Sequence, residues 1–107
     1  MILKLHNLDD ALKKSKNNPV LIYIHSISCG ISSMALTHIN KFNLKNQKTI
    51  IYQVIVQEDK PMSDTIEKRL QVKHESPQLI LINKGKLISV LNHFDITYNN
   101  IKKILSQ

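Results

Sequence analysis

Cys29, the only cysteine in the chain, is the residue whose chemistry the sequence sets up most clearly. It follows an apolar run, Val20 to Ile24, and apolar residues then recur every three or four positions from Ile31 to Phe42, which is typical of a buried helix face. Cys29 is therefore expected where a strand gives way to a helix. Free N–H groups and the positive end of the dipole at a helix start stabilise a thiolate, so this position predicts a reactive thiol.

A lone cysteine can also be a small, inert core residue. The neighbouring residues favour the reactive reading. Ser28 is the expected N-cap of the helix, and Ser32 lies in its first turn, where a hydroxyl can reach the sulfur. We therefore expect an active-site loop formed by Ser28, Gly30, Ile31 and Ser32 around the nucleophile Cys29.

Length and cysteine usage restrict the class of protein. A chain of 107 residues is expected to form one domain, residues 1–107, with a single core. One thiol cannot form an internal disulfide, which favours a reducing cytosol. The first residues lack the pattern of a signal peptide, and the apolar runs are too short to span a membrane. The expected location is cytoplasmic.

The formal net charge of +7 raises the question of nucleic-acid binding. The lysines are scattered along the chain, and aromatic residues make up only 5% of it, too few for base-stacking platforms. We expect a solvated basic surface that attracts anionic thiols or acidic proteins, with neither nucleic acid nor membrane as a partner.

Hydrophobic periodicity and turn signals predict alternating helices and strands. The expected helices are Asn7 to Lys16, Ile31 to Asn43, Ser63 to Leu70 and a last helix capped by Thr97; the expected strands are Val20 to Ile24, Thr49 to Val56, Gln78 to Ile82 and Leu87 to Leu91. The first two strands and the helix between them form a parallel βαβ unit, and the last two form an antiparallel hairpin. The fold class is α/β, with a central four-stranded mixed sheet flanked by helices.

This order, with a cysteine at the start of the second helix and Pro77 heading the third strand, is the thioredoxin-like arrangement. Three segments resemble the monothiol bacilliredoxin family, also called YtxJ-like: residues 25–32 (HSISCGIS), 72–78 (VKHESPQ) and 93–97 (HFDIT). The resemblance spans nearly the whole chain. One departure is Gly30, where the family commonly has proline, a residue that suits the first helical position because it lacks an N–H there.

The resemblance implies a monothiol thiol-disulfide oxidoreductase. Cys29 would attack mixed disulfides between client proteins and bacillithiol, with bacillithiol as co-substrate and no tightly bound cofactor. Ser32 stands where dithiol relatives keep a resolving cysteine. The Ser76–Pro77 bond is expected to be cis, with the backbone of Ser76 facing the incoming thiol. The expected partners are bacillithiolated client proteins and bacillithiol.

Two interpretations remain open for His25 and for Glu75. His25 either tunes the charge of Cys29 or is a satisfied, partly buried histidine. His74 and Glu75 are expected to rim the substrate groove, although Glu75 could instead only hydrogen-bond its own loop.

The remaining histidines are assigned structural or surface positions. His93 and Asp95 are expected to form a turn before Thr97, and His6 and His38 to lie on the surface. No Cys and His spacing matches a closed zinc site, so no metal site is expected.

Two other functions compete with the oxidoreductase. The segment Cys29 to Ser32 (CGIS) is similar to the Cys-Gly-Phe-Ser motif of monothiol glutaredoxins, which carry [2Fe-2S] clusters, but the Gly-Gly segment of those proteins is missing from Ser89 to His93. A thiol-bearing adaptor that docks clients without turnover is the other alternative.

Overall fold

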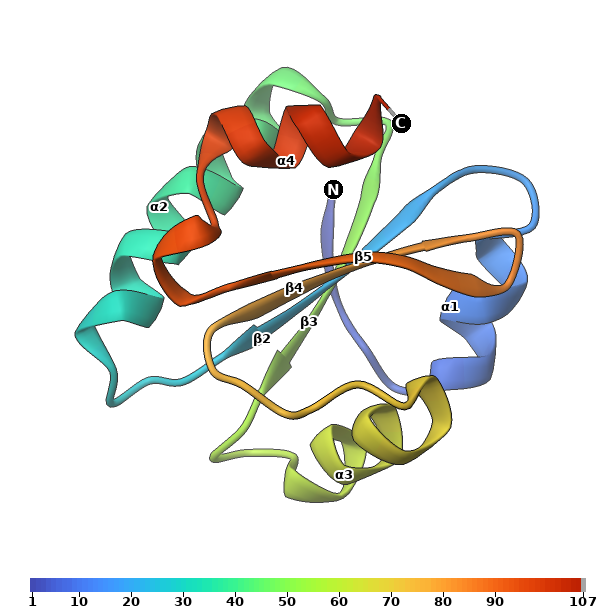
Figure 1. Cartoon of the computed structure of the whole chain (residues 1–107), viewed down its shortest axis with the longest axis horizontal. Coiled ribbons are helices and arrows are strands. Elements are labelled where there is room, and N and C mark those ends of the chain that lie inside the picture. The colour runs from blue at the N-terminus through green and yellow to red at the C-terminus, as the bar shows by residue number, and fades with distance from the viewer. Residues whose placement is uncertain (107) are drawn as a thin grey trace.

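Five strands form one mixed sheet in the order β1-β3-β2-β4-β5 in the computed structural model, which describes residues 1–106 (Figure 1). The strands are β1 (Ile2–Lys4), β2 (Val20–His25), β3 (Ile50–Ile55), β4 (Gln78–Asn83) and β5 (Lys86–Asn92). β2 lies at the centre, parallel to β3 and antiparallel to β4, and β4 and β5 form the predicted hairpin. The α/β, thioredoxin-like architecture is therefore as predicted.

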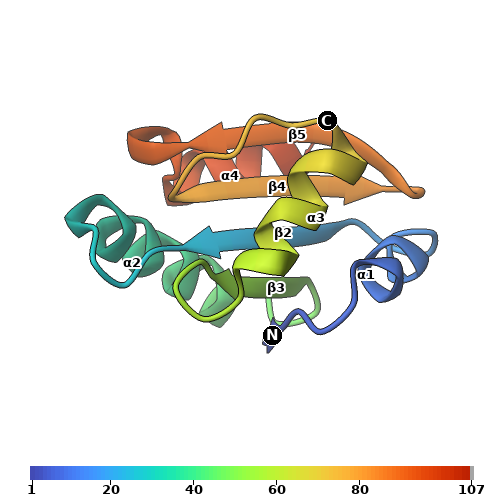
Figure 2. The ribbon, with the colours of Figure 1, turned by 90° about the horizontal axis from the view of Figure 1, so that it is seen from below.

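Helices cover both faces of this sheet. They are α1 (Leu8–Lys14), α2 (Gly30–Lys45), α3 (Lys60–Leu70) and α4 (Tyr98–Leu105), with a 3-10 turn, η1 (His93–Asp95), before α4. Figure 2 shows α1 and α3 on the near face of the sheet, with α2 and α4 behind it. A central strand between two helical layers has no side that faces water, which explains why β2 lacks polar alternation.

Residues of β2 alternate between two hydrophobic clusters. Ile22 and Ile24 pack in the cluster on the side of α1 and α3, whereas Leu21 and Tyr23 pack in the cluster on the side of α2 and α4. All six residues of β2 are buried. The strand that leads to Cys29 is thus held from both faces.

The fifth strand, β1, is absent from the sequence prediction of four strands. It has only three residues, and it pairs in parallel with β3 at the edge of the sheet. The N–H of Ile51 donates to the carbonyl of Met1 over 2.8 Å, and the N–H of Leu5 donates to that of Gln53 over 3.1 Å. A strand this short carries no period of its own and forms only through its distant partner.

Helix α3 starts three residues before the predicted position. Asp59 is its N-cap and accepts the N–H of Met62 over 3.2 Å, and Pro61 lies in its first turn. Ser63, the predicted start, is a buried residue inside the helix. The expected start at Ser63 left Pro61 in the connection after the preceding strand, although proline also suits a first helical turn. Thr97 caps the last helix as predicted, and Asn7, the first residue of the first expected helix, is the N-cap of α1.

The C-terminal ends of β2, β3 and β5 and the N-terminal end of β4 lie at the same end of the sheet. The register pairs His25 with Ile55, Ile24 with Gln78, and Gln78 with Asn92. The loops after β2, β3 and β5 and the loop before β4 therefore lie close together, at the left of Figure 1.

We predict that replacing Ile22, which is 0% exposed at the centre of the sheet, will strongly destabilise the protein. Ile22→Ala should lower the free energy of unfolding by about 2 to 5 kcal/mol, because it loses buried contacts and leaves a cavity. Urea denaturation followed by circular dichroism measures this. The control, Leu44→Ala, changes a residue that is 71% exposed and should stay within about 0.5 kcal/mol of the parent. Equal effects of both changes would contradict the layered core.

Candidate active site around Cys29

Cys29 is the N-cap of α2, in an extended conformation with φ −113° and ψ 123°. Its carbonyl accepts the N–H of Ser33 over 3.3 Å, which closes the first turn. The thiol is half-buried. Ser28 was predicted as the cap, but the N-cap lies one residue later, at Cys29, whose side chain makes no capping hydrogen bond.

The start of α2 lowers the pKa of the Cys29 thiol. The largest cause is the backbone N–H of Ser32, followed by that of Ile31, because both stabilise the thiolate; the hydroxyl of Ser32 adds to this, and partial burial opposes it. A lowered pKa increases the fraction of reactive thiolate at neutral pH. The geometry can therefore support nucleophilic attack by sulfur.

Ser32 is fully buried and links the first turn of α2 to β2 and to the loop that follows it. Its hydroxyl accepts the N–H of Ser26 over 3.2 Å, and its carbonyl accepts the hydroxyl of Tyr23 over 3.1 Å. Tyr23 also contacts Nδ1 of His25 over 2.8 Å. Since the tyrosine has one proton and gives it to Ser32, the proton in the second contact comes from His25.

The Tyr23 and His25 side chains are both kept neutral. Burial lowers the pKa of His25. Burial, followed by repulsion from the Cys29 thiolate, raises the pKa of Tyr23, and the hydrogen bond involving Ser32 opposes this. A neutral His25 supplies no positive charge to the thiolate. Its connection to the site is through the hydroxyl of Tyr23, a residue that the sequence analysis left in the core.

Gln57, two residues beyond β3, contacts the loop from Ser26 to Ser28 directly. Its Nε2 donates to Ser26 Oγ over 2.8 Å and to Ser28 Oγ over 3.1 Å, and its Oε1 accepts the N–H of Ile27 over 3.2 Å. Gln57 was not among the predicted site residues, because a single glutamine after a strand has no distinctive pattern. Only the pairing of β3 with β2 reveals it.

The segment before β4 lies at the same end of the sheet. Its Ser76–Pro77 peptide bond is cis, as the family resemblance implies. Pro77 is buried and its carbonyl accepts the N–H of His93 over 3.0 Å. The Ser76 hydroxyl is buried and has no hydrogen-bond partner within residues 1–106.

His74 and Glu75 face different neighbours. The N–H of His74 donates to the carboxylate of Glu67 in α3 over 2.8 Å. The carboxylate of Glu75 lies 3.2 Å from Nε2 of His93 and 3.9 Å from the ammonium of Lys73. His93 belongs to the predicted structural turn, now seen as η1, and additionally links that turn to Glu75.

His38 differs from its predicted surface position. It is half-buried, and its Nδ1 accepts the N–H of Tyr98 over 3.0 Å at the start of α4. The packing of α4 against α2 covers it, which periodicity within one helix does not reveal.

Apolar side chains are exposed close to the thiol in sequence and space. Ile27 precedes Cys29 by two residues, and Met34 and Phe94 lie on either side of a hollow of about 120 Å³ between α2 and η1 that Ile31 also lines. Ile27, Met34 and Phe94 are all more than half exposed. This surface can receive an apolar segment of another molecule.

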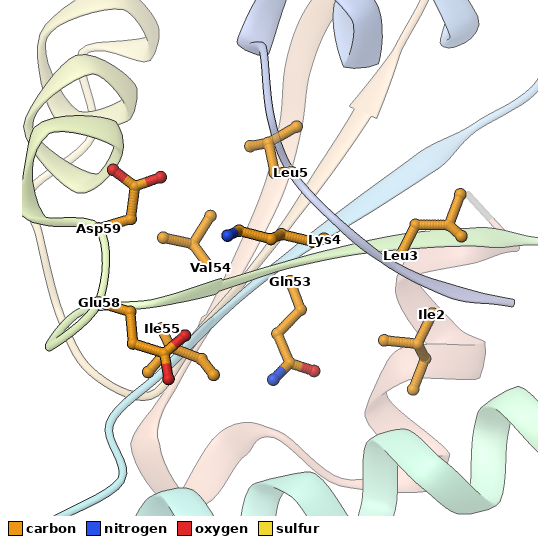
Figure 3. A pocket seen from close by; sticks show the side chains of 9 residues that line it. All are labelled: Ile2, Leu3, Lys4, Leu5, Gln53, Val54, Ile55, Glu58 and Asp59. Atoms are coloured by element: carbon orange, nitrogen blue, oxygen red, sulfur yellow. The ribbon is translucent and has the colours of Figure 1, made fainter.

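A second hollow lies at the opposite side of β3. It measures about 260 Å³ and runs along β1, and Figure 3 shows Lys4, Gln53 and the acidic pair Glu58 and Asp59 around it. None of the residues around Cys29 described above lines it. We assign it no part in the thiol chemistry.

Residues 1–106 contain no group of three His, Cys, Asp or Glu side chains arranged to hold a metal ion. Among the helices of the same residues, none has the length and apolarity needed to cross a bilayer.

Comparisons with known proteins agree with this geometry. The family described as Monothiol bacilliredoxin BrxC matches residues 1–101. A solved structure described as having a thioredoxin fold is similar with a TM-score of 0.84 and 32% identity, over 96% of this chain and 92% of that one.

More distant structures extend the likeness of fold. Fasciola hepatica thioredoxin has a TM-score of 0.77 at 10% identity, over 99% of this chain and 97% of its own. Mitochondrial thioredoxin 3 from Saccharomyces cerevisiae has a TM-score of 0.73 at 24% identity, over 98% and 93%. At these identities the likeness concerns the fold alone.

We predict that Ser32→Ala will raise the pKa of the Cys29 thiol toward its ordinary value, because it removes the hydroxyl and leaves the backbone N–H in place. The rate of alkylation by iodoacetamide should fall about twofold at pH 7, since only the thiolate reacts. The matched control is Ser33→Ala, an exposed serine in the same turn. An unchanged profile for Ser32→Ala would contradict the contribution of this hydroxyl.

We also predict that Gly30→Pro will stabilise the fold by about 0.4 to 1 kcal/mol, because it restricts the unfolded chain. No atom lies within 4 Å of a Cβ placed at Gly30, and Cys29 already has the extended ψ of 123° that suits a residue before proline. Thermal unfolding measures the change. A lower melting temperature would show that glycine is required at this position.

Proposed function

Since the match over residues 1–101 means that the chain belongs to the monothiol bacilliredoxin family, we propose that it removes bacillithiol from mixed disulfides on client proteins. Family and fold together make it a thioredoxin-like thiol oxidoreductase. The observation that carries the finer proposal is the placement of the single thiol at the start of α2, where backbone N–H groups lower its pKa.

The proposed first step is a thiol-disulfide exchange. The Cys29 thiolate attacks the bacillithiol sulfur of the mixed disulfide, a new S–S bond forms between Cys29 and bacillithiol, and the old S–S bond breaks. The client cysteine leaves as a thiolate and takes a proton from water. One disulfide replaces another, so no net oxidation or reduction occurs and no resident cofactor is needed.

The second step requires an external thiol. Ser32 occupies the position from which a resolving cysteine would attack, and the chain has no other cysteine. The thiolate of a second bacillithiol, or of another redoxin, attacks the bacillithiol sulfur bound to Cys29. A new S–S bond forms between the attacking sulfur and bacillithiol, the bond to Cys29 breaks, and Cys29 leaves as a thiolate. These reactions suit a reducing cytosol, where we place the protein.

Two surfaces support binding of the mixed disulfide. The exposed side chains of Ile27, Met34 and Phe94 favour docking of an apolar client segment beside the thiol. A second surface, the pair formed by Glu75 and His93, offers polar groups to the small thiol. His74 and Glu75 keep their proposed place at the rim of the groove.

We predict transfer of bacillithiol from a client to Cys29. Reduced protein mixed with a bacillithiolated client should gain the bacillithiol mass while the client loses it, as measured by intact mass spectrometry. Cys29→Ala should abolish both changes, because it removes the nucleophile. Turnover with excess bacillithiol separates an oxidoreductase from an adaptor, which would bind the client and leave its mass unchanged.

A Ser32→Cys variant sharpens this test. The new thiol replaces the Ser32 hydroxyl, which contributes to the lowered pKa of Cys29. It should attack the Cys29 sulfur of the bound disulfide, release bacillithiol and leave a disulfide between positions 29 and 32. The bacillithiol adduct should then accumulate in the parent protein only. No transfer by the parent, under conditions in which the variant strips the client, would refute monothiol exchange.

A further inference from the structure

We propose that Gln57 is a positioning residue for Cys29: its side-chain amide holds the loop from Ser26 to Ser28 in the conformation that presents the sulfur to the N–H groups at the start of α2. The inference rests on the proposed role of Cys29 as the nucleophile. Gln57 lies 28 positions after Cys29 in the sequence, and its side-chain hydrogen bonds go to residues 26–28.

The amide of Gln57 uses three of its hydrogen-bonding positions on one short loop. Both hydrogens of Nε2 are directed at serine oxygens, Ser26 Oγ at 2.8 Å and Ser28 Oγ at 3.1 Å. Oε1 accepts the N–H of Ile27 over 3.2 Å. The two serine oxygens are themselves 3.3 Å apart, so one hydroxyl donates to the other. One side chain thereby contacts three consecutive residues.

Burial alone does not hold this loop. Ile27 is 63% exposed and Ser28 is also exposed, so neither side chain is anchored in the core. Gln57 itself is carried by a firm support, because Val56 beside it donates its N–H to the carbonyl of His25 over 3.0 Å at the end of the β2 and β3 pair. The hydrogen bonds of the Gln57 side chain therefore restrain the loop from Ser26 to Ser28 relative to the sheet.

Through these hydrogen bonds Gln57 acts on the chain both before and after Cys29. Ser28 directly precedes Cys29. Ser26 donates its N–H to Ser32 Oγ over 3.2 Å, and the N–H of Ser32 is the strongest influence that lowers the pKa of Cys29. Without Gln57, the loop gains freedom on the strand side while the helix stays in place. The sulfur then spends less time in front of the N–H groups, and the thiolate loses stabilisation.

The test is the pH dependence of Cys29 alkylation by iodoacetamide in the folded protein. Gln57→Met keeps the length of the side chain and removes all three hydrogen bonds. It should move the midpoint of the profile upward and slow alkylation at pH 7 by at least about twofold, because a smaller fraction of the thiol is ionised. The control is Gln47→Met, an exposed glutamine in the loop before β3, which should match the parent.

A purely structural role predicts a different result. If Gln57→Met lowers the melting temperature and leaves the alkylation profile unchanged at temperatures where the variant is folded, the positioning role is refuted. Should Gln57→Met fail to fold, Gln57→Asn keeps the amide on a shorter side chain that cannot reach both serines, and the same shift is expected from it.

A double-mutant cycle identifies the route of the effect. In a Ser26→Ala, Ser28→Ala background, adding Gln57→Met should shift the profile less than it does in the parent, because two of its three bonds are already gone. A full additional shift would overturn the proposed route through the serines. Alkylation needs no bacillithiol, so a positive result here stands even if bacillithiol transfer fails, and the reverse outcome is equally distinguishable.

Discussion

The stabilisation of the Cys29 thiolate by the first backbone N–H groups of α2 is the interaction on which the rest of the site depends. Peptide N–H groups at a helix start have no partners within the helix and carry the positive end of its dipole. Cys29 holds the N-cap position of α2, and the backbone N–H groups of Ser32 and Ile31 lower the pKa of its thiol. The first turn of α2 therefore provides the groups that stabilise the thiolate.

The surroundings of the thiol keep this effect independent of nearby charges. Tyr23, His25 and Ser32 form a buried, hydrogen-bonded group below it, and burial holds both titratable members in their neutral forms. The thiolate is thus stabilised by fixed dipoles rather than by a cation that ionic strength would screen. No charged side chain is among the causes that lower the pKa of Cys29.

Sequence patterns predicted the central elements well because these elements carry their signals locally. β2 is a continuous apolar run, α2 has a clear helical period, and the caps Asn7 and Thr97 are typical capping residues. The prediction failed where a signal was short or ambiguous. β1 has three residues without alternation, and Pro61 suits both a strand end and a first helical turn. Ser28 was a better cap by residue type, but the backbone placed Cys29 there.

The sequence by itself determined the nature of the chemistry: one thiol, at a strand-to-helix junction, with a serine where a second thiol would stand. The tertiary structure decided what surrounds that thiol, because the contacts join residues that only strand pairing brings together. Gln57 reaches Ser26 through the β2 and β3 register, Glu75 reaches His93 through the ends of β4 and β5, and His38 is covered by α4. No local pattern encodes such contacts, since each side chain is ordinary for its own segment and acquires its role from a distant one.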